Sequence, residues 1–214
     1  ARILRYNELK QIRKREVYDY IALGHTRDDN LETLIRRCLL GSGPGGMRGI
    51  PPKRDYFIRP LLNVSKEEIL NYLSENKLKY VTDSTNREEN YFRNRVRRRL
   101  IPVIKEIFPS FVSTLPSASE QMREIYEMLQ QAASELPWEP VEKGFRISYK
   151  EFMKKPLQVR IESLYSLYNT QNTALNRAET VKSRLPYRFL KSGLKKLDNS
   201  GNGTILRGYG FKLR

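Results

Sequence analysis

The chain has 214 residues, of which 39% are hydrophobic and 30% charged, so it can bury a core and is not a disordered tail. Its net charge of +16 and its pI of about 10.0 favour a polyanionic partner, with nucleic acid as the leading candidate. No segment approaches the ~20 apolar residues of a transmembrane helix, which argues against a membrane partner. The sequence shows no signal peptide, so we expect a cytoplasmic protein.

A short strand followed by a capped helix is the clearest local signal. Residues 2–17 predict a basic helix, and residues 18–23 predict a strand. Thr26 is a plausible N-cap, and Asp29 three residues later completes a capping box. The helix that follows is expected to bury Leu31, Leu34, Ile35, Cys38 and Leu39. Cys38 is the only cysteine, which excludes an internal disulfide and a Cys-based zinc site, and we expect it to be a buried structural thiol.

The rest of the chain predicts more helices than strands. A glycine-rich loop is predicted over 41–52, a strand over 56–62 and a polar loop over 80–90. A helix over 65–76 is predicted to start with a Ser65–Glu68 capping box, and a basic helix over 90–101 is predicted to be restarted by Pro102. Further on, the sequence predicts helices over 117–135, 156–168 and 187–197 and strands near 145–148 and 204–213. Two strands with several helices cannot form a covered parallel sheet, so we expect further strands upstream of Ala1.

Asp28, Asp29 and Glu32 cluster at the start of one predicted helix, directly after Gly24 and His25. In open α/β sheets, ligands bind beyond the carboxyl ends of strands, so this position favours a functional site. Clustered carboxylates can hold a magnesium ion, orient an amine or act as a general base. The alternative is that they only complement the helix dipole. His25, the only histidine, either contacts a phosphate or base edge or fills a structural niche.

Two further segments each have two interpretations. The loop over 41–52 lacks the G-K-[ST] ending of a P-loop, so it predicts a flexible lid or a packed turn rather than a phosphate site. The segment Y-F-R-N-R-V-R-R-R-L from Tyr91 predicts a helix that either grips RNA or a nucleotide through its guanidiniums or is a solvated basic face. Its apolar stripe consists of Phe92, Val96 and Leu100, and its basic face of Arg93, Arg95, Arg97, Arg98 and Arg99.

Seven motifs follow one another over the first part of the chain. They are A-R-I-L-R-Y at Ala1, A-L-G-H-T-R-D-D-N-L-E-T at Ala22, L-L-G-S-G at Leu39, M-R-G-I-P at Met47, I-R-P-L-L at Ile58, T-D-S-T-N at Thr82 and R-N-R-V-R at Arg93. Their order resembles that of the tRNA(Ile)-lysidine synthetase family, which are PP-loop ATPases related to the adenine nucleotide α-hydrolases. After residue 115 or so, the chain resembles the family only in general layout.

The resemblance implies an α/β protein with a doubly wound, Rossmann-like parallel sheet that binds ATP with Mg2+. It also implies tRNA and free L-lysine as partners, with a homodimer as an open alternative. In this family, ATP adenylates the C2 oxygen of the wobble cytidine in an isoleucine tRNA with a CAU anticodon. The ε-amine of lysine then displaces AMP, which leaves lysidine.

Carried over position by position, the resemblance assigns Asp29 and Glu32 to binding and orienting the lysine amine. It brings Arg93 to the phosphates or the activated base. The residues implied at ATP or cytidine are Arg5, Gly24 and His25, and those implied to support the site or contact tRNA are Arg2, Asn94, Arg97 and Arg98. Asp28 and Asp29 are the candidates for holding a metal ion.

The sequence departs from the family pattern in two respects. The S-G-G-x-D-S loop that cradles the ATP pyrophosphate is absent, and we expect it upstream of Ala1, which would make this an incomplete chain. Thr26 stands where the family has a second histidine. The alternatives are a non-catalytic tRNA-binding protein of the same origin and a related PP-loop tRNA-modifying enzyme. The lone Cys38 argues against a tRNA thiolase, because such enzymes usually carry catalytic cysteines.

Proline-marked breaks at 109–116 and 137–140 predict three parts. Residues 1–110 would form the PP-loop catalytic domain, residues 111–136 a helical connector, and residues 137–214 a small mixed α/β domain that binds tRNA.

Overall fold

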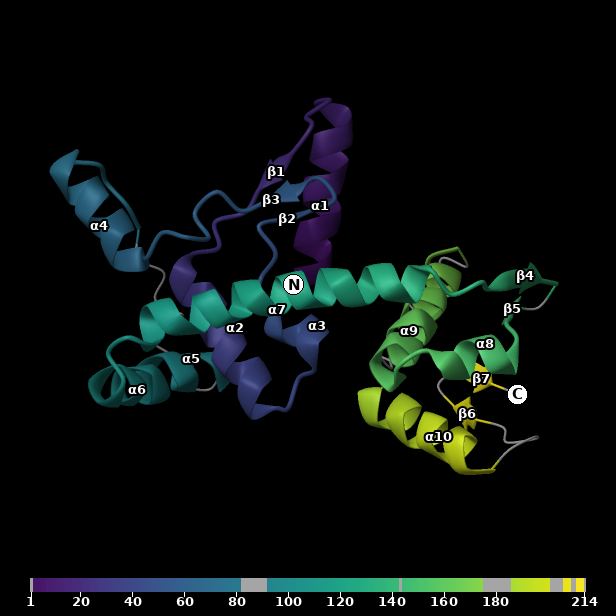
Figure 1. Cartoon of the computed structure of the whole chain (residues 1–214). Coiled ribbons are helices and arrows are strands. Elements are labelled where there is room, and N and C mark those ends of the chain that lie inside the picture. Colours follow the sequence, from purple (N-terminus) through teal and green to yellow (C-terminus); the bar gives the residue numbers. More distant parts are fainter. Residues whose placement is uncertain are drawn as a thin grey trace. The chain divides into compact units, whose positions relative to one another are not determined.

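A computed structural model of the chain describes residues 2–81, 92–142, 144–174, 186–200, 206–208 and 211–213, without the side chains of residues 2, 92, 93, 171–174, 197–200, 206–208 and 211–213. The chain forms two compact units, Ala1–Arg123 and Glu124–Arg214, and the division falls inside one long helix, α7 (Figure 1). Our division into three parts at residues 110 and 136 stays a prediction. No described helix is long and apolar enough to cross a membrane.

The first unit contains a small mixed sheet. Strands β1 (Ile21–Ala22) and β3 (Phe57–Ile58) are parallel, and β2 (Lys53–Arg54) joins the other edge of β3 antiparallel. Both predicted strands lie where expected but are shorter, and β2 was not predicted. Backbone bonds from Ile21 N to Tyr56 O at 2.8 Å and from Leu23 N to Ile58 O at 2.9 Å extend the parallel pairing beyond the strand ends. The doubly wound sheet stays a prediction, because the described residues contain one parallel pair.

Helix α1 (Arg2–Arg15) confirms the predicted basic helix and packs on β3 through rings. The Tyr6 and Phe57 ring centroids lie 5.1 Å apart, and the Arg13 guanidinium lies 4.2 Å from the centroid of the Tyr56 ring. A cation over an aromatic face is attracted by the ring quadrupole. Arg13 therefore packs against the Tyr56 ring, whereas Ile3 at the start of the helix is exposed.

Helix α2 (Arg27–Leu39) confirms the predicted capping box at its start. Leu31, Leu34 and Ile35 are buried as expected. The prediction for the last turn was wrong, because Cys38 and Leu39 are exposed. The core cluster that contains Leu31 and Ile35 takes no residue from the last turn of α2, so that turn extends past its packing partners.

Helix α4 (Lys66–Glu75) also begins with its predicted capping box and ends at the C-cap Asn76. A short helix, α3 (Pro44–Met47), lies inside the glycine-rich segment, where we predicted only a loop. The predicted polar loop over residues 80–90 lies outside the described residues from residue 82 onward.

The basic segment after residue 91 is not one regular helix. It runs as α5 (Phe92–Arg95), a π-helical turn η2 (Val96–Leu100) and α6 (Ile101–Ile107), with Pro102 at the start of α6 as predicted. In a regular α-helix, the proline ring at 102 would clash with the carbonyl oxygen four residues earlier, and it has no N–H to donate. The π turn lies directly before this proline.

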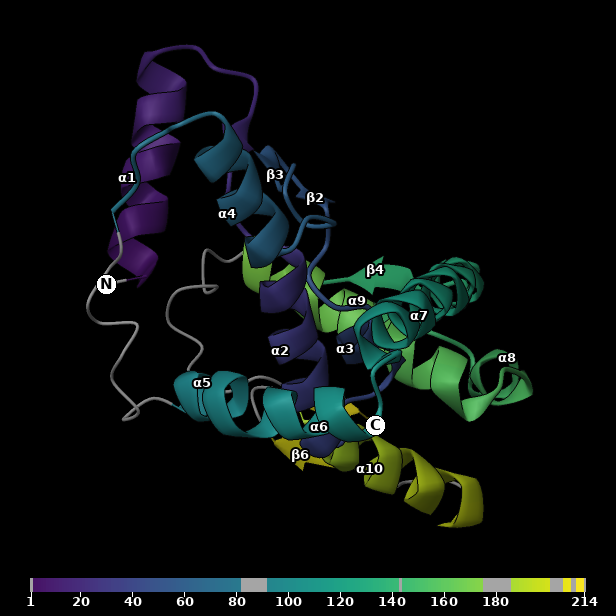
Figure 2. The same ribbon diagram turned by 90° about the vertical axis from the view of Figure 1, so that its left-hand side faces the viewer.

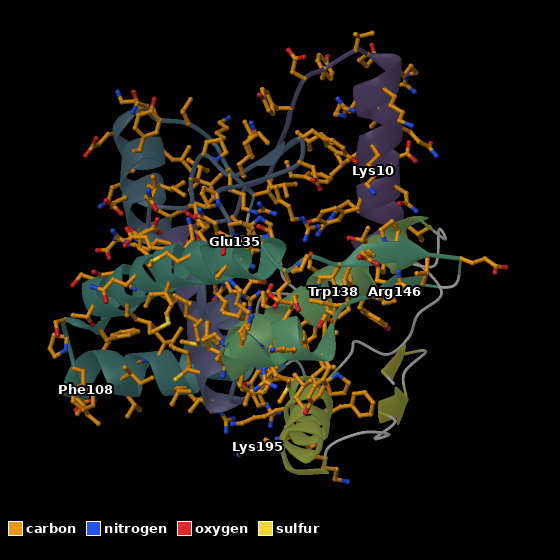
Figure 3. All side chains as sticks on the ribbon, turned by 45° about the vertical axis from the view of Figure 1, so that its right-hand side comes forward. Lys10, Phe108, Glu135, Trp138, Arg146 and Lys195 are labelled. Atoms are coloured by element: carbon orange, nitrogen blue, oxygen red, sulfur yellow. The ribbon has the colours of Figure 1, made fainter. Side chains whose placement is uncertain are left out.

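The core of the first unit forms where α2 meets this segment and the start of α7 (Phe111–Ser134), and Figure 2 shows α2 crossing α5 and α6. The buried members are Leu31, Ile35, Val96 and Phe111, with Leu100, Ile101, Ile104, Val112 and Leu115 packed against them. Helix α7 starts six residues before the predicted Ser117 and runs through Pro116. At the end of α6, Phe108 stays 64% exposed and projects outward (Figure 3).

The second unit combines helices with two hairpins. Its elements are the end of α7, β4 (Glu139–Val141), β5 (Gly144–Arg146), α8 (Tyr149–Lys154), α9 (Leu157–Ala174), α10 (Tyr187–Ser200), β6 (Leu206–Gly208) and β7 (Phe211–Leu213). The predicted helices near 156–168 and 187–197 are present as α9 and α10. Trp138, labelled in Figure 3, packs edge-on against Phe152 with ring centroids 5.6 Å apart. The most buried side chains are Leu164, Leu190 and Leu194.

Candidate functional site

Helix α2 carries two carboxylates, and a basic side chain from η2 reaches both. The side chain of Glu32 is only 2% exposed, and that of Asp29 is 18% exposed. The Nε–H of Arg97 donates to Glu32 Oε1, and Arg97 Nη2 lies 3.6 Å from Asp29 Oδ1. Residues 65 apart in sequence therefore form one cluster. We call Asp29, Glu32 and Arg97 the carboxylate–arginine cluster.

Asp29 also fixes the start of α2. Its Oδ2 accepts from Thr26 N at 2.9 Å, and the Thr26 hydroxyl in turn caps Asp29 N. One carboxylate oxygen of Asp29 thus accepts a hydrogen bond at the N-terminus of α2, while the other faces Arg97. Thr26 is the N-cap of α2.

The π turn presents Arg97 to α2. Val96 is buried against Leu31 and Ile35, and the N–H of Ile101 donates to Val96 O across five residues. The neighbouring Arg97 then lies beside the carboxylates of α2. Single π turns inside helices often occur at functional sites, because the extra residue re-aims the side chains around them.

Asp28 lies apart from this cluster. Its Oδ2 accepts from Lys66 N at 2.7 Å, which places a negative charge at the N-terminus of α4. Asp28 and Asp29 therefore each serve the start of a different helix. No group of three or more His, Cys, Asp or Glu side chains among the described residues is arranged to hold a metal ion. A magnesium ion at Asp28 and Asp29 therefore stays a prediction, and we derive no step through a metal.

Gly24 and His25 follow the last backbone bond of the parallel strand pair, as the sequence predicted. Leu23 N still donates to Ile58 O, and the chain then turns into α2. Gly24 is exposed, and a Cβ built on it would meet no atom within 4 Å, so sterics alone do not require glycine here. His25 is half-buried, with its Nδ1 atom shielded from solvent.

The remaining candidates are spread over α1, α5 and η2. Arg5 is exposed on α1, Arg98 is exposed on η2, and Asn94 is half-buried on α5. The backbones of Arg2 and Arg93 are helical, but their side chains lie outside the described residues, as does the motif at 82–86.

Sequence reasoning missed how the loop over 41–52 is fastened to α2. Gly49 has a φ of +67°, and a Cβ on it would clash with Asn30 Oδ1. That oxygen accepts from Ile50 N at 2.7 Å. Two turns further along α2, Arg37 Nη1 donates to Gly46 O at 2.6 Å and to Gly49 O at 2.9 Å.

Two other arginines also donate to backbone carbonyl groups of the same loop. Arg59, itself 8% exposed, donates from Nη1 to Pro51 O at 2.7 Å, and Arg123 Nη2 donates to Arg48 O at 3.0 Å. The loop over 41–52 is therefore a packed turn and not a flexible lid. The sequence feature that could have predicted this packing is the pair Asn30 and Arg37, two polar residues seven apart that share one face of α2.

Comparison with known proteins places this geometry in a family. Residues 1–104 match the PP-loop domain. The tRNA(Ile)-lysidine synthase of Borrelia garinii subsp. bavariensis is 33% identical over 217 residues, which cover 100% of this chain and 47% of the relative. The chain belongs to the tRNA(Ile)-lysidine synthetase family. The corresponding protein of Treponema denticola is 41% identical over 123 residues, 58% of this chain and 27% of the relative.

A third lysidine synthase, from Bacillus thuringiensis subsp. konkukian, is 40% identical over 170 residues, 75% of this chain and 36% of its own length. The chain spans about half the length of the first of these relatives, at 47%. Membership of this family gives residues 1–104 a Rossmann-like α/β fold class, with which the parallel pair of β1 and β3 agrees. The whole carboxylate–arginine cluster lies inside the matched PP-loop domain.

Proposed function

We propose that this protein ligates lysine to C2 of the wobble cytidine of an isoleucine tRNA with a CAU anticodon, using ATP. The names of the related proteins and the PP-loop match support this reaction. The observation that carries it on the structural side is the pair of carboxylates, Asp29 and Glu32, gathered beside an arginine just beyond the end of a parallel strand.

The proposed reaction has two steps. The C2 oxygen of cytidine first attacks the α-phosphate of ATP, which forms an O–P bond and releases pyrophosphate. The ε-amine of lysine then attacks C2, forming a C–N bond as the C2–O bond breaks and AMP leaves. The amine loses its protons to a base or to water. The reaction needs no oxidant or reductant.

The second step needs a neutral amine, whereas free lysine carries an ammonium group because its pKa is about 10.4. Carboxylates suit both requirements, since they bind the ammonium and can then accept a proton. Asp29 and Glu32 would do this at the start of α2. Arginines close to the departing AMP would offset its negative charge, a role we assign to Arg93 with Asn94 in support.

The nucleotide side of the site is also a proposal. ATP would lie by Gly24 and His25 at the strand end, with Arg5 and Arg2 from α1 near the phosphates or the cytidine. The surrounding sheet would be the doubly wound parallel sheet of the PP-loop fold. The sequence contains no S-G-G-x-D-S loop, so the test of ATP chemistry belongs with a protein that spans the full length of its relatives.

The polyanionic partner would be the tRNA itself. The net charge of +16 supports this, and the exposed Arg98 on η2 is a candidate for a phosphate contact. Residues 137–214 would form the second contact region. A cytoplasmic location would bring together tRNA, ATP and free lysine.

Single-turnover assays with labelled ATP and labelled lysine test this function. We expect the full-length protein to release pyrophosphate only when tRNA is present, and then to incorporate lysine. Glu32→Ala should slow lysine incorporation more than pyrophosphate release, because its carboxylate handles the amine. Glu67→Ala, at an exposed acid of α4, is the matched control. Equal loss of both steps would show that Glu32 serves ATP, and tRNA binding without pyrophosphate release would favour the non-catalytic alternative.

A further inference from the structure

The proposed amine site already holds a cation. Arg97 donates directly to Glu32 and stands 3.6 Å from Asp29, so its guanidinium occupies the position that a substrate ammonium would need. The side chain of Glu32 is 2% exposed, which leaves little surface for a second cation to contact. An incoming ammonium would also be repelled by the resident positive charge.

The two carboxylates hold Arg97 unequally. The contact with Glu32 is a hydrogen bond, whereas 3.6 Å to Asp29 is too long for one. Asp29 is also the more exposed acid, at 18% against 2%. Asp29 is therefore the more accessible of the two carboxylates while Arg97 covers Glu32.

Release of Arg97 into solvent is feasible because its side chain is 36% exposed. A guanidinium that is already partly hydrated loses little by leaving, provided that another cation takes its place on Glu32. Losing a cation from a buried carboxylate is unfavourable, so we expect the departure of Arg97 and the arrival of the new cation to be coupled. The neighbouring Val96 stays in the core, which lets the side chain of Arg97 move without displacing the helix.

We propose that Arg97 is a resident counter-ion of Glu32 and Asp29, and that the lysine ε-ammonium binds by displacing it. This inference rests on the proposed function, because it takes Asp29 and Glu32 as the amine site. Arg97 is then a positioning residue: it holds both carboxylates in place before lysine arrives. Only a ligand that brings its own cation to this point can replace it, which excludes amino acids whose side chain ends without a positive charge.

The direct test follows the Arg97 Nε–H resonance by NMR in the unaltered chain, assigned by its absence in Arg97→Lys. Titration with L-lysine should shift this resonance and increase its exchange with water, while the signal of exposed Arg98 stays unchanged. L-norleucine, which has the same carbon chain without the amine, is the matched control and should leave Arg97 unaffected.

Thermal unfolding of Arg97→Gln gives a second measurement. Saturating lysine should raise the Tm of this variant more than that of the unaltered chain, because the ammonium fills the vacated position without a competitor. Arg98→Gln should show no such gain. An equal response to sodium chloride at the same ionic strength would overturn the proposal.

The outcomes separate the inference from the function it rests on. Lysine binding by calorimetry with an unchanged Arg97 resonance would overturn the displacement and leave the proposed function standing. No lysine binding to the unaltered chain and no rescue of Arg97→Gln would overturn the amine site, and the displacement with it. If Arg97→Gln does not fold, the resonance in the unaltered chain decides alone.

Discussion

The Nε–H of Arg97 donates to the buried carboxylate of Glu32, which joins the π turn η2 to helix α2 across 65 residues of sequence. This contact lies beside the apolar core in which Val96 meets Leu31 and Ile35. The ion pair and the apolar core therefore connect the same two elements, α2 and η2. The stability of the first unit and the placement of its candidate site depend on the same pair.

Arg97→Ala should destabilise the first unit strongly. Removing one partner of a buried ion pair typically costs about 3–5 kcal/mol, and we expect the lower end of this range because Arg97 itself is partly exposed. Urea unfolding measures the change. Arg98→Ala, one residue along on the exposed side, should change the free energy of unfolding by less than about 0.5 kcal/mol. Equal effects of the two variants would show that the pair does not stabilise the fold.

Gly49→Ala should loosen the loop over 41–52. The φ of +67° disfavours any residue with a Cβ, and that Cβ would also push against Asn30 Oδ1. We expect a loss of about 1–3 kcal/mol. The matched control is Gly43→Ala in the same loop, where φ is −72° and a Cβ meets nothing within 4 Å. Faster amide exchange at Ile50 only in Gly49→Ala would support the clamp, and the same exchange in both variants would contradict it.

The start of α4 should weaken in acid. Hydrogen bonds from the side chain and then the backbone of Ser65, with the Arg27 guanidinium nearby, lower the pKa of Glu68 below its ordinary value. A lowered folded-state pKa means that this stabilisation is complete above the ordinary carboxyl pKa and is lost as pH falls through the lower one. The protection of α4 amides, measured relative to their intrinsic exchange rates, should therefore fall at acidic pH, and Glu68→Gln should reduce that pH dependence.

Binding to tRNA should weaken steeply with salt, because each phosphate contact releases counterions. Arg98→Ala should reduce affinity for isoleucine tRNA and for an unrelated tRNA by the same factor and lower the salt slope by about one. Filter binding over a range of salt concentrations measures both quantities. A salt-independent affinity would contradict the basic-surface interpretation, and a loss confined to isoleucine tRNA would make Arg98 a base contact instead.

Several features follow from the sequence alone. Both capping boxes, Thr26 with Asp29 and Ser65 with Glu68, are present as predicted. They involve residues three apart, so the helix start itself brings the partners together whatever the rest of the chain does. The basic helix α1 and the strand end at Gly24 are equally local. The motif order was sufficient to recognise the family.

Only the tertiary structure decided what lies opposite each helix face. Periodicity marked an apolar face on α2, but the core it joins stops at Ile35, which leaves Cys38 exposed. Likewise, the basic run after Tyr91 does not by itself predict that Arg97 pairs with Glu32 while Arg98 stays exposed, because Glu32 lies 65 residues away in sequence. The clamp of Asn30 and Arg37 on the glycine-rich loop also joins segments that are separate in sequence. Local patterns determine how a segment folds, whereas long-range pairing depends on which folded surfaces fit together.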